Sequence, residues 1–188
     1  MTSLDRSIGE LMKKLEETGE LDNTFIIFLS DNGKHWGEHR MDSKSTAYEE
    51  SIKVPYALRY PALVPTPYIE DSLVSNIDIA PTIYELSETP MPKIIDGLSL
   101  LRLLQNKGEW RSTLLLEAWP DRGHWTAIHT GDSIYIETDD DLSEFYDLKT
   151  DPYEMSNMID NPEYQDRIAD LEVIMRKEEQ IRTTAPQE

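Results

Sequence analysis

A short polar segment follows the most apolar stretch of the chain and contains residue types that can bind a divalent cation. The apolar run Phe25–Leu29 ends at Ser30, and Asp31 and Asn32 follow directly. Their side-chain oxygens are hard ligands suited to Ca²⁺ or Mg²⁺, and ligands of open α/β sheets collect at the carboxyl ends of strands. Gly33 completes an Asp-Asn-Gly sequence that is also good turn chemistry. On these residues alone an ordinary turn is favoured over a metal site.

Two basic side chains follow in the same polar segment and would suit an oxyanion. His39 ends a Gly-Glu-His sequence and can donate a proton near neutral pH. Lys44 supplies a compact positive charge. Together with the preceding carboxylate and amide, these side chains indicate an anion site. The alternative is that both are solvated surface groups, which is the usual case for a single His or Lys in an acidic chain.

The elements around this segment predict an α/β architecture. A helical spacing of apolar residues precedes it at Leu4, Ile8, Leu11 and Leu15, with Gly19 as a natural stop. The following run Thr24–Leu29 is apolar throughout, as in a strand that is buried on both faces of a parallel sheet. A helix followed by such a strand is typical of α/β proteins.

The remaining chain divides near Lys107–Trp110. Before this point we expect a strand at Val54–Tyr60 and a helix at Ile79–Leu86. After it, the pattern predicts short strands at Thr113–Glu117, Thr126–His129, Ser133–Glu137 and Glu144–Asp147, with a hairpin at Gly131-Asp132. Asn161-Pro162 starts a last helix, whose apolar face should pack on that small antiparallel sheet. His124 and His129 are interpreted as hydrogen-bonded strand residues, and Trp36 as cover for a loop.

Composition excludes several classes of protein. The 188 residues include 18 Lys and Arg against 37 Asp and Glu, a formal net charge of −19, which repels phosphate backbones and argues against a nucleic-acid partner. No apolar run approaches the roughly 20 residues of a membrane span. The chain has no cysteine, which excludes disulfides, thiolate metal sites and a cysteine nucleophile. No signal peptide is visible at Met1, and the compartment stays unknown.

Five ordered blocks resemble the type I sulfatases of the alkaline-phosphatase-like superfamily. The first combines Ser30-Asp31-Asn32-Gly33, Gly37-Glu38-His39, Lys44 and Tyr48–Pro55; the others are Asn76–Thr82, Asp96–Leu100, Glu144–Leu148, and Asp151–Glu154 with Asn157. The similarity runs from about Ser7 to Lys177, and each block alone would be a weak signal. The resemblance implies part of an alkaline-phosphatase-like α/β/α sandwich, followed by a small antiparallel sheet with a C-terminal helix. The implied domains are 1–107, within the catalytic α/β domain, and 108–188, a small α+β subdomain.

The resemblance also implies roles for four residues. Asp31 and Asn32 match ligands of a divalent cation, Ca²⁺ (or Mg²⁺) in the complete enzyme. Lys44 matches a lysine that contacts the sulfate oxygens, and His39 is implied as a substrate contact, so both are candidate catalytic residues. The partner would be a sulfated small molecule or glycan.

The family's nucleophile, a formylglycine made within a Cys/Ser-x-Pro-x-Arg motif, has no counterpart, because the chain contains neither Cys nor Ser-x-Pro-x-Arg. We therefore expect the C-terminal portion of a sulfatase, inactive alone. The alternatives are a phosphatase or phosphonate hydrolase of the same superfamily, or a non-catalytic binding or scaffold protein. A strand such as Thr24–Leu29, separated from its sheet, would leave an apolar edge through which the chain could self-associate.

Overall fold

The computed structural model describes residues 2–91, 95–119 and 123–184. Its contacts divide the chain into two compact units. The first contains Met1–Ser30, Pro55–Asp71 and Ser75–Glu109, and the second contains Asp31–Val54, Ser72–Val74 and Trp110–Glu188. One change of unit falls at Glu109, close to the predicted domain boundary at 107/108, and the polar segment after Leu29 belongs to the second unit. The domain division itself stays a prediction.

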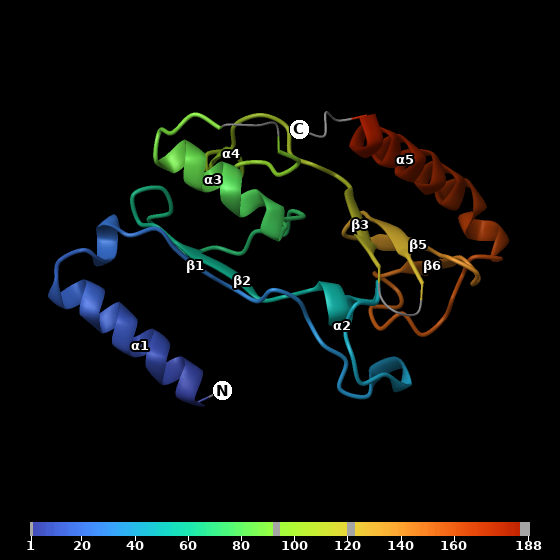
Figure 1. Cartoon of the computed structure of the whole chain (residues 1–188), viewed down its shortest axis with the longest axis horizontal. Coiled ribbons are helices and arrows are strands. Elements are labelled where there is room, and N and C mark those ends of the chain that lie inside the picture. The colour runs from blue at the N-terminus through green and yellow to red at the C-terminus, as the bar shows by residue number, and fades with distance from the viewer. Residues whose placement is uncertain (1, 92–94, 120–122, 185–188) are drawn as a thin grey trace. The chain divides into compact units, whose positions relative to one another are not determined.

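The first unit is built on a two-stranded sheet (Figure 1). Its elements are α1 (Thr2–Glu17), β1 (Ile26–Leu29), β2 (Tyr56–Arg59), α3 (Ile79–Leu86) and α4 (Leu100–Leu104). β1 and β2 pair antiparallel, with Ile26 opposite Arg59 and Leu29 opposite Tyr56. The predicted strands and helices are confirmed, but the expectation of a parallel neighbour and burial on both faces is not met. Phe28 is 38% exposed, because apolar composition predicts a strand without specifying what covers it.

Helix α1 likewise has the apolar spacing that predicts a helix, but its apolar residues are not buried. Its apolar residues have the predicted helical spacing, and Gly19 follows it with a φ of 74°, a conformation that ends helices. None of its described residues is buried, however, and Leu11 remains 56% exposed. An open apolar groove also lies between β1 and α3, lined by Phe25, Ile27, Tyr60, Ile79, Ile83 and Leu86. The first unit therefore leaves much of its apolar surface uncovered.

Asp78 organises the part of the first unit that is well packed. Its buried carboxylate accepts hydrogen bonds from the Ser75 and Leu98 backbone amides, both at 2.8 Å. Thr82 in α3 then accepts from the amide of Leu100 at the start of α4, also at 2.8 Å. Since a buried carboxylate is costly unless it is hydrogen-bonded, these contacts both satisfy Asp78 and fix α4 against α3.

The second unit contains a four-stranded antiparallel sheet in chain order (Figure 1). The strands are β3 (Leu114–Ala118), β4 (Trp125–His129), β5 (Ser133–Thr138) and β6 (Glu144–Asp147), followed by α5 (Gln165–Thr184). The predicted hairpin joins β4 to β5, and Gly131 has the positive φ of 84° that a tight turn requires. Asn161 caps the last helical segment through a 3.0 Å bond from the amide of Glu163. These sequence predictions are confirmed.

Both faces of this sheet are covered. On one face α5 supplies Ile168, Leu171 and Met175, which pack against Ile128, Tyr135 and Phe145. On the other face Ala47 and Tyr48, from the segment Asp31–Val54, pack with Trp125, Ala127, Ile134 and Tyr146. The predicted packing of the last helix on the sheet is confirmed. The second face of the sheet supports the segment that contains the candidate site.

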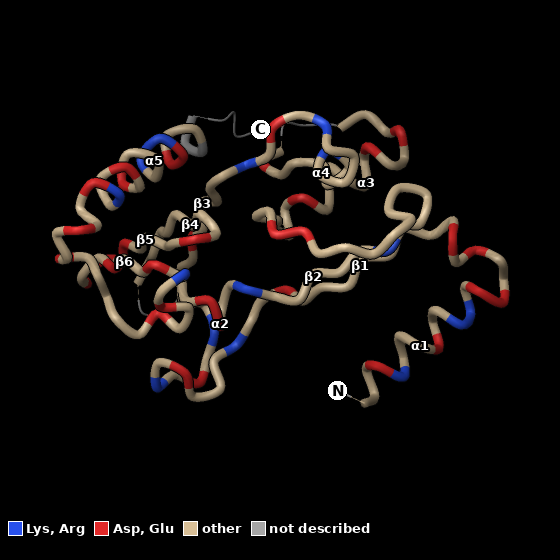
Figure 2. Tube along the Cα trace, turned by 180° about the vertical axis from the view of Figure 1, so that it is seen from behind, with Lys and Arg blue, Asp and Glu red and all other residues tan. Residues whose placement is uncertain are grey.

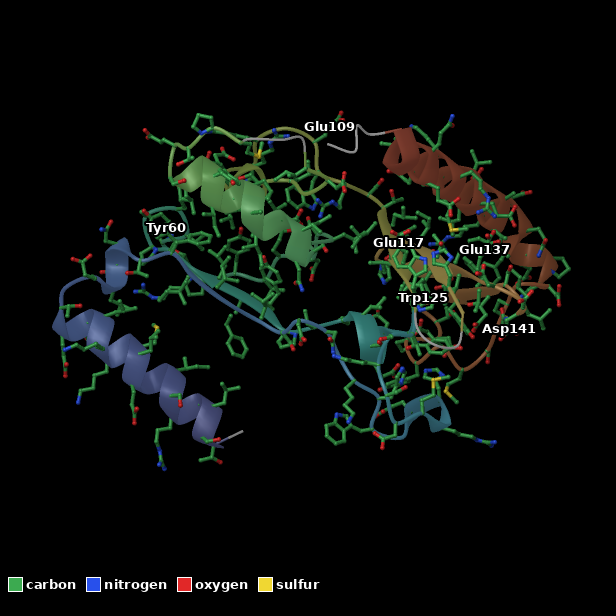
Figure 3. All side chains as sticks on the ribbon, viewed as in Figure 1. Tyr60, Glu109, Glu117, Trp125, Glu137 and Asp141 are labelled. Atoms are coloured by element: carbon green, nitrogen blue, oxygen red, sulfur yellow. The ribbon has the colours of Figure 1, made fainter. Side chains whose placement is uncertain are left out.

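Charged residues lie around this core. Figure 2 shows acidic and basic residues interspersed along α5. Arg176 donates to Glu137 of β5 at 2.5 Å, and Figure 3 shows Glu137 near α5 and Trp125 on the same sheet. Among the described helices, none combines the length and apolarity needed to cross a membrane.

Candidate functional site

The segment Asp31–Val54 folds into a compact loop within the second unit. It contains a short 3-10 helix at Glu38–Arg40 and α2 at Glu49–Ile52. The amide of Gly33 donates to the carbonyl of Ser51 at 2.9 Å. A Cβ on Gly33 would lie 2.0 Å from the carbonyl oxygen of Glu50, so only glycine permits this approach. The loop is therefore closed against α2 immediately after Asp31 and Asn32.

Asn32 and Lys44, two of the four predicted site residues, are in direct contact. The ammonium of Lys44 donates to the Asn32 side-chain carbonyl over 3.0 Å. Asp31 accepts from the amide of Asn32 at 2.9 Å, which holds the neighbouring carboxylate at the same turn. Asp31 and Lys44 are exposed and Asn32 is half-buried. The three side chains form an accessible cluster, with two oxygen atoms that could bind a metal ion, from Asp31 and Asn32, and one ammonium group, from Lys44.

The donor set of Asp31 and Asn32 fits a divalent cation. A carboxylate and an amide carbonyl are hard oxygen ligands of the kind that Ca²⁺ and Mg²⁺ take. Ca²⁺ takes about 6–8 oxygens, so two side chains would supply only part of its shell. The Lys44 ammonium beside them would attract the anion that such a cation also binds.

His39, another predicted site residue, contacts a different set of groups. Its ring stacks on Tyr48 with centroids 4.1 Å apart and an interplanar angle of 7°. Its Nε2 lies 3.4 Å from Oε2 of Glu50, and the side chain is 11% exposed. The backbone at His39 has a φ of 51°, an uncommon conformation outside glycine. The substrate-contact role of His39 stays a prediction.

A hydrogen-bonded chain links α2 to β4. The His129 ring accepts at Nδ1 from the amide of Gly131 at 2.9 Å, so its proton is on Nε2, which donates to Glu49 at 2.9 Å. Burial would raise the pKa of the Glu49 carboxyl, but hydrogen bonds from His129 and Lys53 outweigh burial and leave the pKa lowered. The reading of His129 as a hydrogen-bonded strand residue is confirmed, whereas its partner was not predictable from spacing.

Glu154 is the most deeply buried carboxyl near this loop. It is 2% exposed, and one of its oxygens accepts from the amide of Glu49 at 2.8 Å. Burial, reinforced by the charges of Glu49, Glu50 and Glu144, raises the pKa of Glu154 to about 8. Sequence reasoning placed Glu154 only inside a motif, since no local pattern reveals that it reaches α2.

Two other side chains of the loop differ in their degree of burial. Trp36 is 79% exposed, and the ammonium of Lys34 lies over its ring, 4.6 Å from the ring centroid. His35 is fully buried, and its Nε2 lies 2.7 Å from the hydroxyl of Thr46. Alternation of exposed and buried residues in an irregular loop has no period from which it could be predicted.

Comparison with known proteins agrees with the resemblance to sulfatases of the five sequence blocks between Ser30 and Asn157. The family model described as N-sulphoglucosamine sulphohydrolase, C-terminal, matches residues 37–181. A N-acetylglucosamine-6-O-sulfatase of Bacteroides thetaiotaomicron is 32% identical over 99% of this chain and 36% of its own length. The N-acetylglucosamine-6-sulfatase of Homo sapiens is 42% identical over 62% of this chain and 22% of its own length.

Solved structures agree in fold. A protein solved in complex with its substrate D-glucosamine-2-N,6-O-disulfate superposes with a TM-score of 0.83 at 32% identity, over 95% of this chain and 38% of that one. The phosphonate monoester hydrolase of Agrobacterium radiobacter has a TM-score of 0.82 at 22% identity, over 94% of this chain and 40% of that one. At that identity the second likeness shows the fold alone.

The fold and the matched region are those of the C-terminal part of proteins with the alkaline-phosphatase-like fold. The chain belongs to the sulfatase family, through the N-sulphoglucosamine sulphohydrolase C-terminal region. It spans just over a third of the length of the first curated relatives that it matches. Family membership implies a divalent metal in the complete enzyme.

Proposed function

We propose that the protein containing this chain hydrolyses sulfate esters and that Asp31, Asn32, His39 and Lys44 form part of its sulfate-binding site. The observation that carries the proposal is the 3.0 Å contact between the Lys44 ammonium and the Asn32 carbonyl, beside Asp31. This contact supports the proposal, because an oxyanion bound by the predicted metal ligands would also lie close to the Lys44 ammonium. The sulfatase relatives support this choice of anion.

Lys44 has a defined chemical task in this proposal. Its ammonium would neutralise the negative charge that grows on the sulfate oxygens as the ester bond breaks, an effect worth most in a preorganised site. The hydrogen bond to Asn32 shows that the ammonium can reach the predicted metal ligands. Ca²⁺ or Mg²⁺ bound by Asp31 and Asn32 would polarise the sulfate as a Lewis acid. The nucleophile would come from outside this chain, which has no Cys or Ser-x-Pro-x-Arg motif.

The proposed substrate class is a sulfated glycan carrying 6-O-sulfated glucosamine. This choice rests on relatives named N-acetylglucosamine-6-sulfatase or N-acetylglucosamine-6-O-sulfatase. A phosphonate monoester is the second candidate, because two phosphonate monoester hydrolases share the fold. Sulfate and phosphonate monoesters are both tetrahedral anions, so the same Lys44 would serve either.

The proposal is tested with the protein encoded by the longest reading frame that contains this chain. The measurement is the release of sulfate from N-acetylglucosamine 6-sulfate. Lys44→Ala should lower kcat about a hundredfold or more, as for the loss of other oxyanion contacts. Lys34→Ala is the matched control, because Lys34 lies in the same loop and pairs with Asp42 at 3.6 Å. Equal activity of the two variants would contradict the proposed site. Faster hydrolysis of a phosphonate monoester would favour the second candidate.

The 188-residue chain alone should show no turnover of an aryl sulfate, because losing the nucleophile removes the covalent route. It should also bind Ca²⁺ only weakly, since water must complete the shell. Aryl-sulfate hydrolysis above that of a Lys44→Ala variant, or tight Ca²⁺ binding by calorimetry, would contradict these two expectations.

A further inference from the structure

One group of side chains outside the Asp31–Asn32 pair offers convergent metal ligands. His39, Glu50 and Glu154 each contribute one ligand atom, and the three atoms lie within 4.8 Å of one another. His39 comes from the 3-10 helix, Glu50 from α2 and Glu154 from the loop after β6. Three separate segments of the second unit thus direct electronegative atoms toward one point.

These atoms have unmet bonding capacity. Among the described residues, His39 Nε2, Glu50 Oε2 and Glu154 Oε1 are buried and lack a hydrogen-bond partner. Glu154 is only 2% exposed, so water cannot readily satisfy its free oxygen. Since a buried polar atom without a partner is destabilising, three of them at one point favour a cationic partner there.

The geometry favours an ion over direct hydrogen bonding. His39 Nε2 and Glu50 Oε2 are 3.4 Å apart, longer than the usual N–H···O distance. Two ligands that both lie about 2.0–2.2 Å from a tetrahedral ion are about 3.3–3.6 Å apart. The flat stacking of His39 on Tyr48 fixes the ring plane, and the second Glu154 oxygen is anchored by the amide of Glu49.

We propose that His39, Glu50 and Glu154 form a second metal site that binds a divalent first-row transition ion such as Zn²⁺. One imidazole nitrogen with two carboxylates suits Zn²⁺, Mn²⁺ or Co²⁺, whereas an oxygen-only set suits Ca²⁺. The side chains of His39 and Glu50 are 11% and 19% exposed, although their ligand atoms are buried. Water would complete the coordination.

The ion would act as a clamp within the second unit. It would join the loop that carries Lys44 to the segment after β6, with Glu50 and Glu154 more than a hundred residues apart in sequence. The carboxylates of Glu49, Glu50 and Glu144 act on Glu154 as like charges, so a divalent ion would reduce their mutual repulsion.

Zn²⁺ titration of the metal-stripped chain by calorimetry tests this proposal, together with Co²⁺ absorption as a report on nitrogen–oxygen ligation. We expect one saturable site and a rise in the unfolding temperature with Zn²⁺. Glu154→Gln and His39→Asn should each weaken binding about tenfold or more. Asparagine tolerates the positive φ at position 39, and Gln can still accept from the amide of Glu49.

Two control variants separate this site from the alternatives. Glu163→Gln removes an exposed carboxyl, and Asp31→Asn alters the predicted Ca²⁺ ligands; both should leave Zn²⁺ binding unchanged. Circular dichroism confirms folding, and Glu50→Gln replaces any variant that fails this check. Absence of saturable Zn²⁺ binding, or binding that survives the ligand substitutions, would overturn the proposal. Neither result bears on the proposed roles of Asp31, Asn32 and Lys44 in the hydrolysis of sulfate esters.

Discussion

The two sheets of this protein differ in burial, although the strands of the less buried sheet, β1 and β2, are apolar except for Arg59. Every residue of β4 is buried, whereas no residue of β1 or β2 is. The four-stranded sheet has an apolar cluster on each face, while β1 borders an open groove. Strand composition therefore predicts where strands form, and the elements that pack on them decide how much stability they add.

The largest expected difference lies in the two cores. Phe145 of β6 is fully buried, and Phe28 of β1 is 38% exposed. Phe145→Ala should lower the free energy of unfolding by about 3–5 kcal/mol, because it leaves a cavity in a closed core. Phe28→Ala should cost about 1 kcal/mol or less. Urea unfolding followed by circular dichroism measures both, and equal losses would contradict the comparison.

The buried carboxyl of Glu154 gives the second unit a pH dependence. Its pKa is raised to about 8 by burial and by Glu49, Glu50 and Glu144, against about 4.3 in an unfolded chain. Between these values the folded state binds more protons, so the free energy of unfolding falls as pH rises. We expect a loss on the order of 3–4 kcal/mol between pH 5 and 8 in the presence of a chelator.

Glu154→Gln removes the titrating carboxyl and so tests whether the pH dependence of stability comes from Glu154. The amide stays neutral at every pH and can still accept from Glu49. The pH profile of the variant should therefore be flatter than that of the unsubstituted chain over the same interval. A parallel pair of profiles would assign the dependence to a group other than Glu154.

The uncovered sheet should affect association. β1 and β2 form a sheet of two strands, so each has one edge without a strand neighbour among the described residues, and such edges template pairing between chains. The net charge of −19 opposes association at low salt. Light scattering should show a higher mean mass at high salt, where that repulsion is screened. Ile27→Lys should reduce the rise; a monomer at both salt concentrations would argue against an exposed edge.

The smallest expected effect concerns the cap of the last helical segment. Asn161 accepts from the amide of Glu163 at 3.0 Å. Asn161→Ala should lower the free energy of unfolding by about 1 kcal/mol, because it leaves a helix donor without its side-chain acceptor. Asn161→Ser keeps an acceptor and should restore most of the loss. Thermal unfolding measures the difference, and a Ser variant no better than Ala would argue against capping.

Much of the fold was predictable because it follows local patterns. The strands β3 to β6, the hairpin at Gly131 and the start of the last helical segment each depend on residues close in sequence. The proximity of Asn32 and Lys44 followed from motif resemblance, and a 3.0 Å contact now joins them.

The rest depended on distant contacts. Glu49 meets His129 across 80 positions and Glu154 across 105. No spacing rule connects residues so far apart, and a carboxyl in a loop is most often solvated. The prediction that β1 is buried on both faces was wrong for a related reason. The residues of a strand do not determine which strand pairs with it or which elements pack on it.

The division of the second unit along the chain has a consequence for biosynthesis. The loop Asp31–Val54 shares a unit with Trp110–Glu188, so it leaves the ribosome long before the residues that cover it. At about 5–20 residues per second, the 105 positions between Glu49 and Glu154 take roughly 5–20 seconds to synthesise. During that time Ala47 and Tyr48 have no sheet to pack on. Nascent chains should therefore stay sensitive to proteases in this loop until the last strands emerge.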